Sequence, residues 1–149
     1  MIDTRTAPYA ALILRVALGV MFLVHSLYLK LVVFTLPGTV KFFESLGLPA
    51  ASAYLTIAVE AIGGILLIVG FKTRYAAIAL VPVLLGASWV HWKNGWLFTN
   101  TGGGWEYPVF LAVATVAQAL IGDGAFALSG TPAAYASRVP NLKAEPHTA

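Results

Sequence analysis

Two ionisable residues, Arg15 and Glu60, lie deep inside long apolar stretches of the sequence. Each stands six residues into its stretch. A charge near the centre of a bilayer costs about 2.5–3.5 kcal/mol to insert, so it normally faces protein or water and has a partner. Two interpretations stay open: a structural ion pair or polar clamp, and a polar site for a ligand or a proton. Gln118 and Asp123 are the alternative partners for Arg15.

A second group of polar residues is expected near the outer face of the membrane. Histidine can transfer protons near neutral pH and carboxylates can relay them, although interfacial histidines also serve simply as hydrogen-bonding residues. Two histidines together with Glu60 or Glu106 would supply the side-chain types that bind a metal ion. These residues come from separate segments and form no local metal-binding motif, so we expect no metal. With Arg15 and Glu60, the candidates for ligand binding or proton handling are His25, Lys30, His91 and Glu106.

Four long apolar segments must position these residues. Of the 149 residues, 59% are hydrophobic and only 10% are charged, and the mean hydropathy is +0.83. A helix needs about 20 mostly apolar residues to cross a bilayer. The sequence therefore predicts an all-α integral membrane four-helix bundle, one domain over residues 1–149, with a loose tail at 129–149. The expected spans are 9–29, 54–71, 75–92 and 107–128.

Composition excludes several classes of function. The chain has no cysteine, so it has no thiol nucleophile, Zn–Cys site or disulfide. The nine Lys and Arg residues are scattered and form no basic stripe, so nucleic-acid binding is not expected. No phosphate-binding loop, dinucleotide fingerprint, metalloprotease motif or nucleophile elbow is present.

The distribution of basic residues predicts the orientation, because cytoplasmic loops carry an excess of Lys and Arg. With four spans, the side that holds both termini has five such residues and the other side has three. We therefore expect the termini in the cytoplasm and the four tryptophans at the outer boundary. The first side holds Arg5, Lys72, Arg74, Arg138 and Lys143, and the second holds Lys30, Lys41 and Lys93.

Small residues at helical spacing predict where the helices approach closely. The second segment has Thr56, Glu60, Gly63 and Gly64 on one face. The fourth has a face of Ala112, Thr115, Ala119 and Gly122. Between the first two segments, residues 40–46 form a short amphipathic piece suited to the membrane interface.

From about Leu14 to Leu128 the sequence resembles the DoxX family of small four-helix membrane proteins. The resemblance departs at Ser26, where the family commonly has glycine, and at Ser129, where its motif usually ends in aspartate. It is carried by the order of several short motifs: Arg15-Val-Ala-Leu-Gly19, His25 with Lys30, Glu60-Ala-Ile-Gly-Gly64, His91 with Asn94-Gly95, Gly104-Trp-Glu-Tyr107 and Gly122-Asp-Gly-Ala-Phe-Ala-Leu128.

The resemblance implies a protein of the bacterial inner membrane of a kind commonly labelled an oxidoreductase. Related DoxD-like subunits belong to thiosulfate:quinone oxidoreductases, and DoxX takes its name from association with a terminal quinol oxidase. Eukaryotic surfeit-locus cargo receptors are more distantly similar. If the chain does redox chemistry, the electrons must pass through a quinone or a partner subunit.

Three functional hypotheses follow, and whether the chain is itself an enzyme stays open. The first is a quinone-associated subunit of a membrane oxidoreductase complex, with redox partner subunits in the lipid bilayer. The second is a small carrier or a binding protein for lipids or hydrophobic solutes. The third is a structural or assembly subunit without chemistry of its own.

Overall fold

The structure is a computed structural model that describes residues 3–129. All regular structure in this part of the chain is helical, so the predicted all-α class is confirmed there. In chain order the elements are α1 (Ala7–Leu23), the π-helix η1 (Val24–Val33), α2 (Leu36–Ser45), α3 (Ala50–Val69), α4 (Thr73–His91), the 3-10 helix η2 (Trp92–Asn94) and α5 (Glu106–Ile121).

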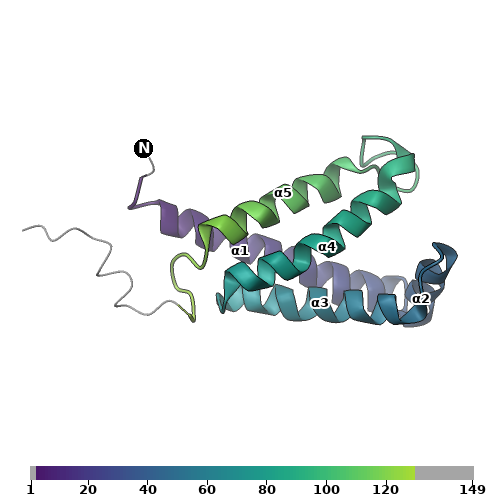
Figure 1. The fold of residues 1–149 in the computed structure, drawn as a ribbon, viewed down its shortest axis with the longest axis horizontal. Helices are drawn as coiled ribbons and strands as arrows, with labels where there is room; N and C mark the ends of the chain where they lie inside the picture. Colours follow the sequence, from purple (N-terminus) through teal and green to yellow (C-terminus); the bar gives the residue numbers. More distant parts are fainter. Residues whose placement is uncertain (1–2, 130–149) are drawn as a thin grey trace, which may run out of the picture.

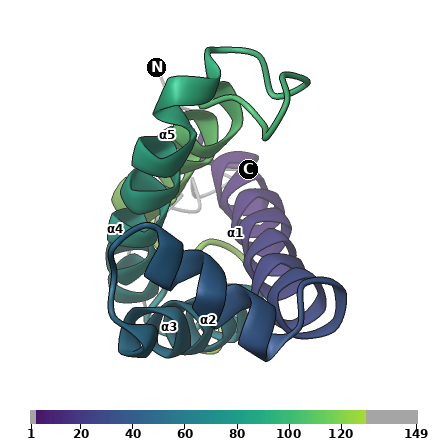
Figure 2. The same cartoon turned by 90° about the vertical axis from the view of Figure 1, so that its right-hand side faces the viewer.

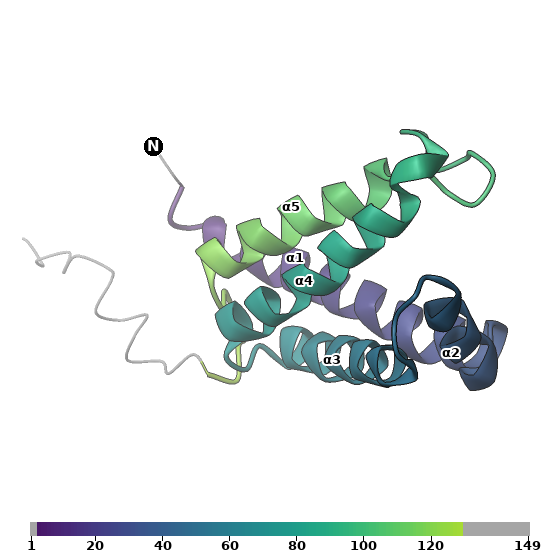
Figure 3. The same ribbon diagram turned by 45° about the vertical axis from the view of Figure 1, so that its right-hand side comes forward.

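The long helices form two antiparallel pairs, α1 with α3 and α4 with α5 (Figure 1). The pairs meet at the end that carries the start of α1, the α3–α4 turn and the end of α5, which we call the turn end. They diverge toward the other end, which carries α2 and the loop at 95–105 (Figure 3). We call this second end the loop end.

Glycines allow the backbones of α1 and α3 to approach each other. A Cβ atom added at Gly19 would lie 2.7 Å from the carbonyl oxygen of Gly64, and one at Gly64 would lie 2.9 Å from that of Gly19. The neighbouring Gly63 instead makes room for the Leu80 side chain of α4. Of the small face predicted for the second segment, Glu60, Gly63 and Gly64 are buried and Thr56 is half-buried, and the two glycines contact two different helices.

Three helical stretches are long and apolar enough to cross a bilayer: 7–33, 50–69 and 73–94. The fourth helix, α5, has 16 residues and is shorter than the predicted span of 107–128. At about 1.5 Å per residue it covers about 24 Å, less than the roughly 30 Å of hydrocarbon. It ends at Ile121 because the next residue, Gly122, has φ of 88°, and Gly124 with φ of 71° continues the turn.

Residues 122–129, the return segment, fold back across the turn end. The N–H of Ala125 donates to the carbonyl oxygen of Pro8 at 2.9 Å, and the N–H of Leu128 donates to that of Val69 at 3.0 Å. The Ser129 hydroxyl donates to the carbonyl oxygen of Gly70 at 2.9 Å, so Ser129 belongs to this attached segment. The rest of the predicted loose tail, 130–149, lies outside the described residues.

The first apolar helix continues beyond the predicted Leu29 as η1, in which the N–H of Phe34 donates to the carbonyl oxygen of Leu29 at 2.8 Å. The chain then reverses at Thr35, with φ of 60°, and α2 lies across the loop end beside α3 (Figure 2). The Thr39 hydroxyl donates to the carbonyl oxygen of Lys30 at 2.8 Å and joins α2 to η1. The predicted amphipathic piece at 40–46 overlaps α2.

Candidate functional site

A partly buried ion pair joins η1 to α3. Lys30 Nζ lies 2.6 Å from Glu60 Oε2, and the two side chains are 18% and 7% exposed. Lys30 Nζ also donates to the carbonyl oxygen of His25 at 3.5 Å. The second carboxylate oxygen of Glu60, Oε1, makes no hydrogen bond with the described residues. It is also not among the fully buried polar atoms that lack a partner, so it is not completely enclosed by the described part of the chain. A small molecule that reached the pair would therefore find one oxygen unoccupied by the described part of the chain.

His25 stands next to this pair, on η1. Its Nδ1 lies 2.8 Å from the carbonyl oxygen of Met21. Because a carbonyl oxygen only accepts, Nδ1 carries the hydrogen, and Nε2 of the neutral ring is the atom that can take up a proton. The His25 ring stacks on the ring of Tyr107 from α5, with centroids 6.1 Å apart and planes 25° apart. Lys30, Glu60, His25 and Tyr107 together form what we call the ion-pair site.

Tyr107 is not among the six residues predicted for the site. Its hydroxyl donates to the sulfur of Met21 at 3.6 Å, so the start of α5 lies against the end of α1. An aromatic residue at the start of an apolar helix carries no signal that distinguishes it from the many others at the membrane boundary.

His91 and Glu106 make their hydrogen bonds within the loop at 95–105 and not with the ion pair. His91 Nδ1 lies 3.0 Å from the carbonyl oxygen of Gly102, and Glu106 Oε1 accepts from the N–H of Phe98 at 2.9 Å. Stacked indoles stabilise the same loop, since the Trp92 and Trp105 ring centroids lie 4.7 Å apart. These contacts make both residues loop anchors.

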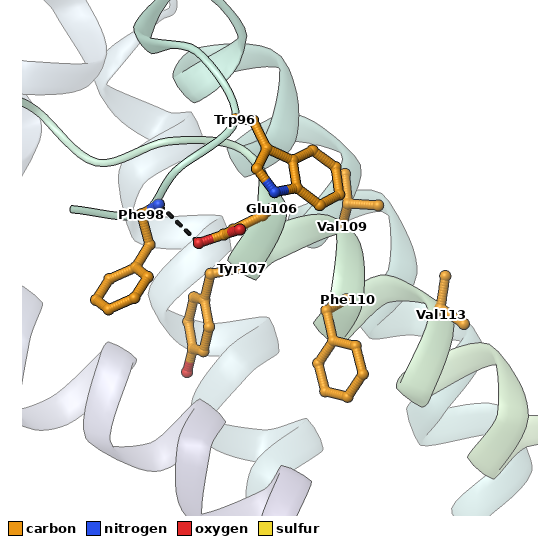
Figure 4. Close-up of a pocket in the computed structure, with 7 residues that line it drawn as sticks. All are labelled: Trp96, Phe98, Glu106, Tyr107, Val109, Phe110 and Val113. Atoms are coloured by element: carbon orange, nitrogen blue, oxygen red, sulfur yellow. Dashed lines mark hydrogen bonds between the residues drawn. The ribbon is translucent and has the colours of Figure 1, made fainter. Parts of the chain in front are cut away.

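Beside this loop, a mostly apolar groove of about 460 Å³ opens along the start of α5 (Figure 4). Glu106 lies at the centre of its loop side, and Tyr107 also borders it. Tyr107 thus belongs to both the groove and the ion-pair site. The other lining residues are Trp96, Phe98, Val109, Phe110 and Val113.

Arg15 is 1% exposed at the turn end, where its guanidinium binds backbone oxygens. Its Nη1 donates to the carbonyl oxygen of Leu67 at 2.9 Å and to that of Ile68, and its Nη2 donates to that of Ala125 at 3.0 Å. Leu67 and Ile68 stand in the last turn of α3, where carbonyl groups lack partners within the helix. Arg15 therefore caps α3 and holds the return segment.

Arg15 makes no hydrogen bond or ion pair with Glu60 in the described part of the chain. The two alternative partners also bond elsewhere: Asp123 Oδ1 accepts from the N–H of Thr73 at 3.0 Å, and Gln118 Nε2 donates to the carbonyl oxygen of Gly122 at 2.7 Å. Of the six predicted site residues, the structure brings together His25, Lys30 and Glu60. Within residues 3–129 no three metal-ligating side chains form a group that could hold a metal ion.

Comparison with known proteins agrees with this arrangement of apolar helices. The family model named DoxX matches residues 10–92, more than half of the chain. The chain belongs to the DoxX family. Since residues 3–129 also contain three helices long and apolar enough to cross a bilayer, it is a multi-pass membrane protein. The match includes His25, Lys30 and Glu60, whereas Glu106 and Tyr107 lie beyond it.

The chain is also similar to a curated protein of Bacillus subtilis (strain 168) named "Putative oxidoreductase CatD". The two are 41% identical over 76 residues, which cover 51% of this chain and 54% of the relative. The chain thus matches about half of the length of that relative. No solved structure matches it significantly.

Proposed function

We propose that this DoxX-family protein is a quinone-associated subunit of an oxidoreductase complex in the bacterial inner membrane. The observation that carries the proposal is the Lys30–Glu60 ion pair, held at 2.6 Å among apolar helices. Lys30 also donates to the carbonyl oxygen of His25, whose ring stacks on that of Tyr107. Ionisable residues in a membrane span are costly and commonly mark ligand or proton pathways. The name of the Bacillus subtilis relative supports oxidoreductase chemistry for the complex.

The residues of the ion-pair site fit a quinone head group, which has polar oxygens on a flat ring. A bound quinone would supply the two-electron redox chemistry, while the chain would bind and orient it and hold protons. The Lys30 ammonium is a donor for a carbonyl oxygen. Glu60 Oε1 and His25 Nε2 are the acceptors for hydroxyl protons of the reduced form, and the Tyr107 ring is an apolar flank.

In this proposal the chain supplies the binding site, and electrons pass to a partner subunit. The predicted orientation, with both termini in the cytoplasm, puts the loop end and its tryptophans at the periplasmic boundary. His25 Nε2 and Glu60 would then exchange protons on that side of the membrane.

Quantifying quinone in lipid nanodiscs tests the proposal. Wild-type protein reconstituted with ubiquinone or menaquinone should retain about one quinone per chain after washing, measured by extraction and mass spectrometry. Glu60→Gln keeps the size of the side chain but removes the charge that pairs with Lys30, so retention should fall several-fold. Glu44→Gln removes a carboxylate from the exposed part of α2 and should retain wild-type amounts.

Equal retention in the wild type and Glu60→Gln, at the level of bulk lipid, would refute the quinone site. Thermal unfolding of each variant in the same nanodiscs shows whether a loss of quinone reflects a loss of fold.

A further inference from the structure

A second groove lies between α4 and α5 near the turn end, away from the ion-pair site. Its volume is about 490 Å³. Several lining side chains are strongly exposed on the outer surface of the helix pair, such as Ile78 at 55% and Leu120 at 75%. Its apolar walls are Ile78, Val81, Pro82, Val116, Ala119 and Leu120, and Arg74 completes the lining.

Arg74 is fixed at the end of this groove by a bond to α5. Its Nε donates to the carbonyl oxygen of Ala119 at 3.0 Å. Ala119 lies in the last turn of α5, which ends at Ile121, so this carbonyl lacks a partner within the helix. The bond orients the guanidinium, and its Nη groups make no hydrogen bond with any residue from 3 to 129. Four N–H donors are therefore left at the end of the groove for a ligand.

The position of the groove matches one leaflet of a bilayer. Arg74 stands in the first turn of α4, where a spanning helix meets the head groups. Pro82 is eight residues further, which is about 12 Å along the helix. Half of the hydrocarbon thickness is roughly 15 Å. The groove thus runs from a cationic group at head-group depth over most of the length of one acyl chain.

We propose that this groove binds one anionic phospholipid, whose phosphate pairs with Arg74 and one of whose acyl chains lies between α4 and α5. The planar guanidinium fork matches phosphate oxygens and can bind two of them at once. The groove lining includes no acidic residue, and nearby Asp123 already accepts from the N–H of Thr73. Exposed Lys72 is not part of the groove lining, and its Nζ lies 5.6 Å from the centroid of the Phe71 ring.

The experiment measures lipid retention in nanodiscs that mix phosphatidylcholine with phosphatidylglycerol. Lipids that stay bound after transfer to detergent are counted by native mass spectrometry. Wild-type protein should be enriched in phosphatidylglycerol, and Arg74→Gln should lose about tenfold of that enrichment. Lys72→Gln removes the same charge two residues away and should keep the enrichment. Similar losses of phosphatidylglycerol enrichment in both variants would show that any positive surface charge attracts the lipid, and this would overturn the proposal.

A groove-filling pair of variants tests the acyl chain and does not depend on the Arg74 contact with Ala119. Val116→Trp fills the groove and should also lose the enrichment. Val113→Trp makes the same change on α5 outside this groove and should bind normally. If Val116→Trp binds like wild type while inorganic phosphate competes at Arg74, the site takes free phosphate, and the lipid proposal is wrong. Thermal unfolding in pure phosphatidylcholine shows that each variant is folded.

Discussion

The two buried charge centres of this protein are built in different ways. Arg15 binds three backbone carbonyl oxygens, on Leu67, Ile68 and Ala125, whereas Lys30 pairs with a second ionisable side chain, Glu60. A backbone carbonyl group is not an ionisable group, whereas a carboxylate is. The contrast favours an architectural role for Arg15 at the turn end, and in our proposal the ion-pair site is where the chain binds its ligand.

Removing the Arg15 charge should give the largest loss of stability. Arg15→Gln cannot reach all three carbonyl oxygens, and a hydrogen bond from a charged group is worth about 1.5–3 kcal/mol. We expect a loss of about 3–5 kcal/mol in the free energy of unfolding, measured by circular dichroism during unfolding in mixed detergent micelles. Lys41→Gln, at an exposed site on α2, should unfold like the wild type.

The same variant also tests the contrast between Arg15 and the ion-pair site. Folded Arg15→Gln protein that retains less quinone than the wild type would show that the turn end also takes part in ligand binding. Unchanged stability would show that the carbonyl contacts contribute nothing.

A double-mutant cycle on Lys30 and Glu60 should give an intermediate effect. Lys30→Met or Glu60→Met leaves one uncompensated charge among apolar helices, which should cost about 2–3 kcal/mol, less than in a fully buried pair because Lys30 is 18% exposed. The double variant removes both charges and should recover at least about 1 kcal/mol of the summed loss. Chemical unfolding of the four proteins measures this coupling, and strictly additive effects would mean that the pair does not interact. No second side-chain change should rescue Arg15→Gln, because its acceptors are backbone groups.

Replacing either of two glycines by alanine should change the free energy of unfolding least, and the two changes should have opposite signs. Gly70 has φ of 70°, and an added Cβ atom would lie 2.8 Å from Arg15 Cζ, so Gly70→Ala should lose about 1–3 kcal/mol. Gly86 lies inside α4 with nothing within 4 Å of the added atom. Gly86→Ala should gain about 0.5–1 kcal/mol from helix propensity. Melting temperatures in one detergent compare the two, and a stable Gly70→Ala protein would show that Arg15 tolerates displacement.

Much of the fold could be predicted from the sequence, because hydropathy and small-residue spacing report directly on lipid exposure and helix contact. The end of α5 was predicted too far along the chain. The apolar residues from Ala125 to Leu128 outweighed Gly122 and Gly124, although two glycines within three residues are a helix-ending signal.

The contacts of the candidate site were less predictable. The pairing of Lys30 with Glu60 could not be predicted, because it depends on the continuation of the first helix past Leu29 as the π-helix η1. A count of apolar residues does not reveal that continuation. The acceptors of Arg15 are backbone oxygens, which every residue type carries, so no sequence pattern marks them. His91 and Glu106 were grouped with His25 by expected depth alone, and their loop contacts depend on the path of residues 95–105.

The return segment also constrains how the protein is made. Arg15 is synthesised 110 residues before Ala125, which supplies one of its acceptors, and the acceptors on α3 emerge after 52 and 53 residues. The nascent first helix thus enters the membrane with its positive charge unsatisfied by the final contacts. The last of these contacts forms only after α5 and Ala125 have left the ribosome, so assembly of the bundle finishes after translation has passed residue 125.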